Sequence, residues 1–125
     1  MPPLLQPPGS RILLIDGNHI IGIWLTLWFT ENDINVRLIN DHFEDLLDTA
    51  NPVWAGVDVL MCDLYLDGSI TGNEILEFAK KSFPSIKRVL VTGGKGPDRD
   101  AALLNANALV VKPSEPDVFL KAVTA

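Results

Sequence analysis

The sequence predicts an α/β fold built on one parallel five-stranded sheet. Five short apolar runs recur along the chain, and segments with helical character separate them. Uninterrupted apolar runs are typical of strands that are covered on both faces, and their alternation with helices predicts right-handed βαβ crossovers. The chain has 125 residues, of which 47% are hydrophobic and 21% charged, so it has the size and composition of one globular domain.

The predicted elements follow a proline-rich leader over residues 1–10. The expected strands cover residues 11–15, 35–39, 57–62, 88–91 and 108–111. The expected helices cover residues 19–32, 41–50, 72–82, 97–104 and 114–125. Polar, glycine and proline residues separate the runs, with Asp41 a plausible N-cap and Asn51-Pro52 a helix stop. We therefore expect the leader to be flexible and residues 11–125 to form the domain.

Composition excludes several classes of function. Ten Lys and Arg against sixteen Asp and Glu give a net charge of −6, which argues against a nucleic-acid-binding surface. Cys62 is the only cysteine, so no internal disulfide forms, and a reducing, cytoplasmic compartment fits. The apolar run over residues 20–29 is too short to span a bilayer, and the leader lacks the charged start of a signal peptide.

Four polar side chains stand where predicted strands end. Asp16 ends the first strand, Asp63 follows the third, Thr92 ends the fourth and Lys112 follows the fifth. In parallel sheets ligands bind beyond these carboxyl ends. Aspartate is a nucleophile in phosphoryl transfer, two converging carboxylates favour Mg²⁺ between them, and a lysine can pair with a phosphoryl oxygen. The constellation predicts phosphorylation of Asp63, with the Thr92 hydroxyl as a further donor.

The order and spacing of these pieces resemble the receiver domain of two-component response regulators. The matching segments are residues 11–16, residues 58–63 with Gly72 nine residues on, residues 89–92 and residues 110–113. The resemblance implies a flavodoxin-like (βα)5 three-layer sandwich with strand order 2-1-3-4-5. It also implies a signalling domain that at most catalyses its own phosphorylation and dephosphorylation.

The same resemblance implies roles for individual residues. Asp63 would accept a phosphoryl group from a histidine kinase or a phosphotransfer protein. Asp16, Asp63 and the backbone carbonyl of Tyr65 would hold Mg²⁺, while Thr92 and Lys112 would sense the phosphoryl group. No direct binding of nucleic acid or membrane is expected of this domain.

Two departures from the family pattern leave an alternative open. Gly17 stands where the family usually carries a second acid, which predicts weaker Mg²⁺ binding and slower phosphorylation. Leu109 stands where the family usually has Tyr or Phe, so a switch would have to run through Thr92 and the loop over residues 93–97. The alternative is a pseudo-receiver that binds partners independently of phosphorylation.

The first helix is apolar on both sides. Ile21, Leu25 and Phe29 form its expected core stripe, whereas Ile20, Ile23 and Leu27 fall on the opposite side, where a lone domain should be polar. Exposed apolar patches usually mark interfaces. We therefore expect a surface for a partner or for self-association into a homodimer, unless the leader covers these side chains.

Overall fold

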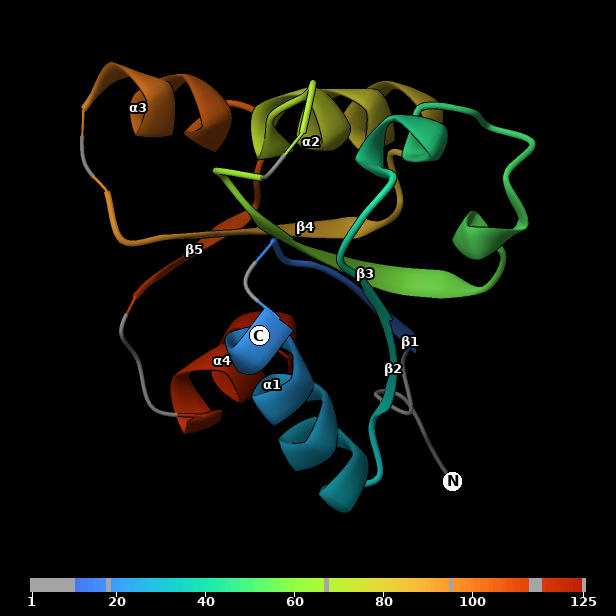
Figure 1. Cartoon of the computed structure of the whole chain (residues 1–125), viewed down its shortest axis with the longest axis vertical. Helices are drawn as coiled ribbons and strands as arrows, with labels where there is room; N and C mark the ends of the chain where they lie inside the picture. Colours follow the sequence, from blue (N-terminus) through green and yellow to red (C-terminus); the bar gives the residue numbers. More distant parts are fainter. Residues whose placement is uncertain (1–10, 18, 67, 95, 113–115, 125) are drawn as a thin grey trace.

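The strands form one parallel sheet, as predicted. The computed structural model describes residues 11–17, 19–66, 68–94, 96–112 and 116–124, and the predicted leader lies outside them. The strands are β1 (Arg11–Ile15), β2 (Asn35–Ile39), β3 (Val57–Asp63), β4 (Lys87–Thr92) and β5 (Ala108–Val111). Their order is β2-β1-β3-β4-β5 with every pair parallel, which confirms the flavodoxin-like topology (Figure 1).

In the described part of the chain, four α-helices cover the two faces of the sheet. Helices α1 (His19–Glu31) and α4 (Pro116–Thr124) lie on one face, below the sheet in Figure 1. Helices α2 (Gly72–Ser82) and α3 (Pro97–Leu103) lie on the other face. The result is the predicted three-layer sandwich. In the part of the chain that the structure describes, no helix has the length and hydropathy needed to cross a membrane.

The prediction of a helix over residues 41–50 is wrong. The connection between β2 and β3 instead contains two short 3₁₀ helices, η2 (Phe43–Leu46) and η3 (Pro52–Trp54). Its buried side chains, Phe43 and Leu46, stand three residues apart, which matches the period of a 3₁₀ helix. The N-cap is His42, with a left-handed φ of 51°, and not Asp41.

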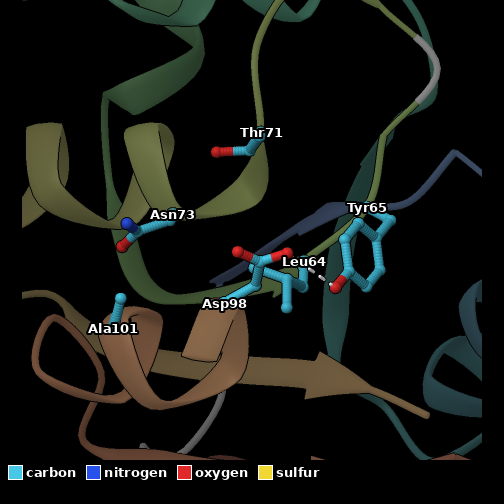
Figure 2. Close-up of a pocket in the computed structure, with 6 residues that line it drawn as sticks. All are labelled: Leu64, Tyr65, Thr71, Asn73, Asp98 and Ala101. Carbon is cyan, nitrogen blue, oxygen red and sulfur yellow. Dashed lines mark hydrogen bonds between the residues drawn. The ribbon is translucent and has the colours of Figure 1, made fainter. Parts of the chain in front are cut away.

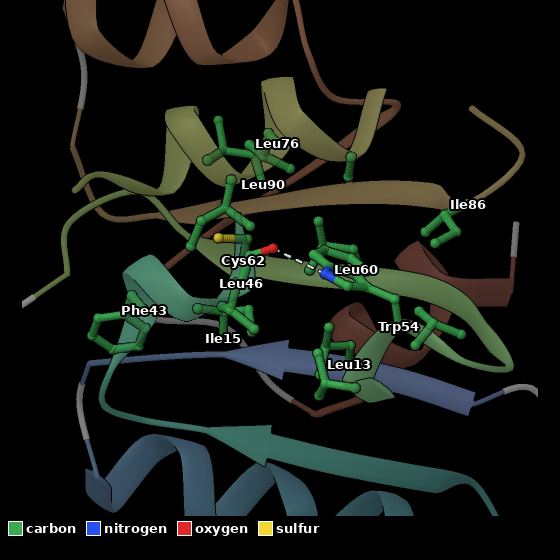
Figure 3. Packing of buried hydrophobic residues seen from close by; sticks show 14 of the residues in the cluster. Leu13, Ile15, Phe43, Leu46, Trp54, Leu60, Cys62, Leu76, Ile86 and Leu90 are labelled. Atoms are coloured by element: carbon green, nitrogen blue, oxygen red, sulfur yellow. Dashed lines mark hydrogen bonds between the residues drawn. The ribbon is translucent and has the colours of Figure 1, made fainter. Parts of the chain in front are cut away.

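Local hydrogen bonds explain why this connection does not continue as an α-helix. The Asp48 side chain accepts a hydrogen bond from the Ala50 amide at 2.9 Å, and the Asn51 side chain accepts one from the Val53 amide at 3.0 Å. Such side-chain contacts offer the backbone an alternative to helical pairing. The Trp54 indole then ties the two turns together by donating to the Leu46 carbonyl at 2.9 Å (Figure 3).

Buried side chains of the strands alternate between two hydrophobic clusters. One cluster packs under α2, α3 and the 3₁₀ helices and includes Leu13, Ile15, Leu60, Cys62 and Leu90 (Figure 3). The other packs against α1 and α4 and includes Ile12, Leu14, Met61, Val89 and Val91 from the strands, with Leu25, Phe29 and Phe119 from the helices. Because the central strands are covered on both faces, only their ends reach solvent.

Gly72 brings α2 against the end of β3. Thr71 caps the helix, and its hydroxyl and the Glu74 side chain form a reciprocal capping box. The Gly72 amide donates to the Leu64 carbonyl at 2.8 Å, and a Cβ at Gly72 would overlap the Asp63 carbonyl oxygen. The missing side chain therefore lets the helix approach the segment that carries Asp63.

We predict that Gly72→Ala destabilises the fold by about 2 kcal/mol or more, because the added methyl group forces the start of α2 away from β3. The measurement is urea unfolding monitored by tryptophan fluorescence. Gly93→Ala is the matched control, since a Cβ there would meet the Lys112 carbonyl oxygen at an ordinary 3.6 Å. Equal unfolding midpoints for the two variants would contradict this account of Gly72.

Candidate functional site

The structure places the four predicted site residues at successive strand ends of the carboxyl edge. Asp16 follows β1, Asp63 and Thr92 close β3 and β4, and Lys112 follows β5. Asp16, Asp63 and Thr92 are only 2%, 9% and 1% exposed. Parallel pairing aligns these ends, because Asp63 pairs with Val91 and Thr92 pairs with Val111.

Lys112 joins the two carboxylates. Its Nζ lies 2.9 Å from Asp63 Oδ2, within hydrogen-bond distance, and 3.9 Å from Asp16 Oδ2. Buried charges need such partners, since desolvation otherwise costs several kcal/mol per ion. Two carboxylates and one ammonium nevertheless carry more negative than positive charge, which favours the approach of a further cation.

Thr92 is held by its own loop. The Gly94 amide donates to Thr92 Oγ1 at 3.1 Å, and the Lys112 amide donates to the Thr92 carbonyl at 3.0 Å. The second bond continues the pairing of β4 with β5 and sets Lys112 beside Thr92. The structure thus brings Asp16, Asp63 and Lys112 into direct contact and places Thr92 on the strand end next to them.

The oxygen donors suit a hard cation that keeps several water ligands. Asp16 and Asp63 contribute carboxylates, and Gly17 contributes none. Within the described residues no group of three or more His, Cys, Asp or Glu side chains is placed to hold a metal ion. Mg²⁺ is commonly bound through one or two carboxylates with retained waters. The set therefore fits Mg²⁺, although the cation would share these carboxylates with Lys112. The part expected of the Tyr65 carbonyl stays a prediction.

Cys62 lies directly behind the site and belongs to the core. Its side chain is fully buried, and Sγ lies 3.4 Å from the Asp63 carbonyl oxygen. Burial raises the pKa of the Cys62 thiol well above its ordinary value, and the charges of Asp63 and Asp16 raise it further. The thiol therefore stays protonated and inert, which agrees with a packing role.

A neighbouring cavity is lined by side chains to which the sequence gave no role, although it named the backbone carbonyl of Tyr65 as a metal ligand. It has a volume of about 130 Å³ and is lined by Leu64, Tyr65, Thr71, Asn73, Asp98 and Ala101 (Figure 2). Across it, the Tyr65 hydroxyl donates to Asp98 Oδ2 at 3.1 Å. This contact raises the pKa of the Tyr65 phenol, mainly through the hydrogen bond itself. The two residues are 33 positions apart, so no local sequence pattern connects them.

Solved structures of other proteins resemble this chain, whereas sequence comparisons give no match. No family model matches the sequence, and no curated protein sequence matches it. A response regulator receiver domain protein (CheY-like) from Methanospirillum hungatei superposes with a TM-score of 0.79 at 25% identity, covering 91% of this chain and 90% of that chain. The chemotaxis protein CheY4 of Vibrio cholerae gives a TM-score of 0.76 at 20% identity, with 91% and 95% covered.

A third solved structure, a response regulator protein from Burkholderia pseudomallei, gives a TM-score of 0.76 at 20% identity, covering 91% of this chain and 66% of that chain. It contains a phosphorylated aspartic acid and a calcium ion. This chain is therefore similar in structure to the receiver domains of response regulators, over nine-tenths of its length. The resemblance inferred from the sequence is confirmed at the level of the fold.

The distances in the ion-pair cluster predict unequal couplings in unfolding free energy. In a double-mutant cycle of Asp63→Asn with Lys112→Met, we expect a coupling of about 1–2 kcal/mol, because the paired atoms are in contact and mostly buried. The cycle of Asp16→Asn with Lys112→Met should give a smaller value, since that pair is 3.9 Å apart. Urea unfolding at pH 7 without divalent cations measures both. A coupling near zero for Asp63 would contradict the ion pair.

Proposed function

We propose that this domain receives a signal by accepting a phosphoryl group on Asp63 from a phosphohistidine of a histidine kinase or phosphotransfer protein. The observation that carries the proposal is the 2.9 Å contact between Lys112 Nζ and Asp63 Oδ2 at the carboxyl edge of the sheet. It supplies a nucleophilic carboxylate together with a fixed positive charge for the incoming group. The structural likeness to receiver domains supports the same assignment.

The reaction follows from the residues at this edge. A carboxylate oxygen of Asp63 forms a bond to phosphorus as the bond from phosphorus to the donor imidazole nitrogen breaks, and that nitrogen takes up a proton. Lys112 neutralises charge on the phosphoryl oxygens, and the Thr92 hydroxyl turns from the Gly94 amide to donate to one of them. Mg²⁺, when held by Asp16, Asp63 and the Tyr65 carbonyl, would neutralise charge on the same group. Later hydrolysis restores the carboxylate.

The output of this reaction would be a local rearrangement. Turning Thr92 towards the phosphoryl group removes the acceptor of the Gly94 amide, so the loop that follows β4 and the start of α3 shift. Leu109 is partly buried and packs against the first hydrophobic cluster, so no aromatic ring stands at that position to swing inward. The domain is a signalling receiver and not an enzyme with a separate substrate, and we place it in the cytoplasm.

Gly17 and Lys112 favour one alternative, a pseudo-receiver that binds partners without phosphorylation. Gly17 removes one potential metal ligand, and the Lys112 ammonium already contacts both carboxylates. Such a cluster could serve as a structural ion pair alone. The two functions differ in whether Asp63 accepts a phosphoryl group.

We further propose that α1 is the partner surface. Ile23 and Leu27 of the predicted surface are 50% and 60% exposed, while the side chain of Ile20 lies outside the described residues. Leu25 and Phe29 on the opposite side are buried against the sheet. An uncharged, apolar surface beside the phosphoacceptor edge suits the helical surface of a phosphohistidine donor, with a homodimer as the other outcome of the test.

Intact mass spectrometry after incubation with acetyl phosphate tests the phosphoacceptor. We expect a Mg²⁺-dependent gain of one phosphoryl group in the wild-type chain and no gain in Asp63→Asn. Asp33→Asn is the matched control, because Asp33 is an exposed aspartate whose left-handed φ of 62° asparagine also adopts. No gain in the wild type at high Mg²⁺ would make the pseudo-receiver the correct reading.

Removing the apolar surface of α1 should slow protein-mediated phosphorylation selectively. We expect the double variant Ile23→Ser, Leu27→Ser to accept phosphate from acetyl phosphate as the wild type does, but from a phosphorylated histidine phosphotransfer protein at least tenfold more slowly. Leu104→Ser is the control, because Leu104 is 77% exposed at the end of α3. Light scattering that shows a dimer disrupted by the double variant would instead assign the surface to self-association.

A further inference from the structure

Tyr65 connects the segment after β3 to the first turn of α3. It follows Asp63 by two residues, and its hydroxyl donates to Asp98 Oδ2, in the first turn of α3, at 3.1 Å. Figure 2 shows the ring reaching across towards α3, with this bond drawn. More than half of Tyr65 is exposed, so packing alone fixes the ring only weakly. The hydrogen bond to Asp98 therefore largely sets where the ring lies.

The ring also lies beside the turn that holds Thr92. A Cβ placed on Gly94 would be 3.7 Å from Tyr65 Cε2 and 3.6 Å from Thr92 Oγ1. The Gly94 amide donates to that same Oγ1 at 3.1 Å. The phenol ring, Gly94 and the Thr92 hydroxyl thus lie side by side, and a displaced ring changes the surroundings of the Gly94 turn.

The backbone at the start of α3, which carries Asp98, is well fixed. Gly96 precedes the helix with a φ of 111°, Pro97 opens it, and the Asp100 amide donates to the Gly96 carbonyl at 3.0 Å. Proline at the first helical position is preorganised for the helix. The same tyrosine therefore places its ring beside Gly94 and bonds through its hydroxyl to Asp98, where α3 begins. The adjoining cavity of about 130 Å³ gives the ring room to move.

We propose that Tyr65, held by Asp98, is a positioning residue for Thr92. It keeps the Gly94 turn in the conformation that binds the Thr92 hydroxyl, and so it sets how readily that hydroxyl turns towards a phosphoryl group on Asp63. The second half rests on the proposed function, whereas the first concerns the unphosphorylated protein alone. Releasing Tyr65 should loosen the Gly94 turn and favour the phosphorylated state.

Amide hydrogen exchange at Gly94, followed by NMR in the full chain without a phosphodonor, tests the first half. We expect Tyr65→Phe, which keeps the ring and removes the hydroxyl, to speed exchange of the Gly94 amide about threefold to tenfold, the size expected for one hydrogen bond. Asp98→Ala should have the same effect, and the double variant no larger one. Asp98→Asn retains an acceptor oxygen and should stay within twofold of the wild type.

Asp100→Ala is the matched control for Asp98→Ala, because it also removes an exposed aspartate from the first turn of α3. An unchanged Gly94 amide in both Tyr65→Phe and Asp98→Ala would overturn the proposal. An Asp100→Ala effect equal to that of Asp98→Ala would also overturn it, since the cause would then be the charge at the helix start.

The phosphorylated fraction at limiting acetyl phosphate tests the second half. Tyr65→Phe should raise it by about the same factor as it raises Gly94 exchange, while Asp98→Asn should not. Faster exchange with an unchanged phosphorylated fraction would overturn this half. If Gly94 responds as expected but no variant takes up phosphate, the positioning role stands and the proposed phosphoacceptor function fails, so the two failures are distinguishable.

Discussion

The ion pair between Lys112 and Asp63 is the interaction on which the site depends. An aspartate that is 9% exposed, with a second carboxylate nearby, needs a positive charge to offset desolvation and repulsion. Lys112 supplies it from the end of a different strand, so the cluster exists only when β1, β3 and β5 are in register. The site is thus a property of the assembled sheet, and its two carboxylates carry more charge than the one ammonium balances.

The packing around Asp63 leaves its backbone little freedom. Gly72 presses the start of α2 against the Asp63 carbonyl, and the Cys62 side chain is fully buried in the core beneath. This restraint suits the role proposed for Asp63, because a displaced nucleophile loses its contacts to the transferred group. The described part of the loop after Thr92 is held differently, by the hydrogen bond from the Gly94 amide to the Thr92 hydroxyl, with the exposed Tyr65 ring beside it.

The sequence predicted the features that depend on local patterns. Apolar runs at β1, β3 and β4 predicted buried strands, and the polar residue after each run predicted the edge that Asp16, Asp63 and Thr92 occupy. The connection over residues 41–50 was predicted wrongly, because Phe43, Leu46 and Leu47 suggest a helix while the side chains of Asp48 and Asn51 compete for its backbone. The contact between Tyr65 and Asp98 could not be predicted, since it depends on the relative placement of β3 and α3.

Positions 109 and 65 bear on how a signal could leave this site, because one lacks an aromatic ring and the other carries one. Leu109 on β5 offers no ring that could change rotamer, whereas Tyr65 places a ring beside Gly94 on the other side of Thr92. A movement of Thr92 would therefore first change the hydrogen bond from the Gly94 amide. It would then change the hydrogen bond between the Tyr65 hydroxyl and Asp98 on α3. β5, which carries position 109, lies at the edge of the sheet, whereas α3 lies on one face of the sheet. A route from Thr92 to Asp98 therefore ends on a different surface from a route through position 109. Under the proposed function, the absence of a ring at Leu109 and the hydrogen-bonded ring of Tyr65 would together place the output at the start of α3.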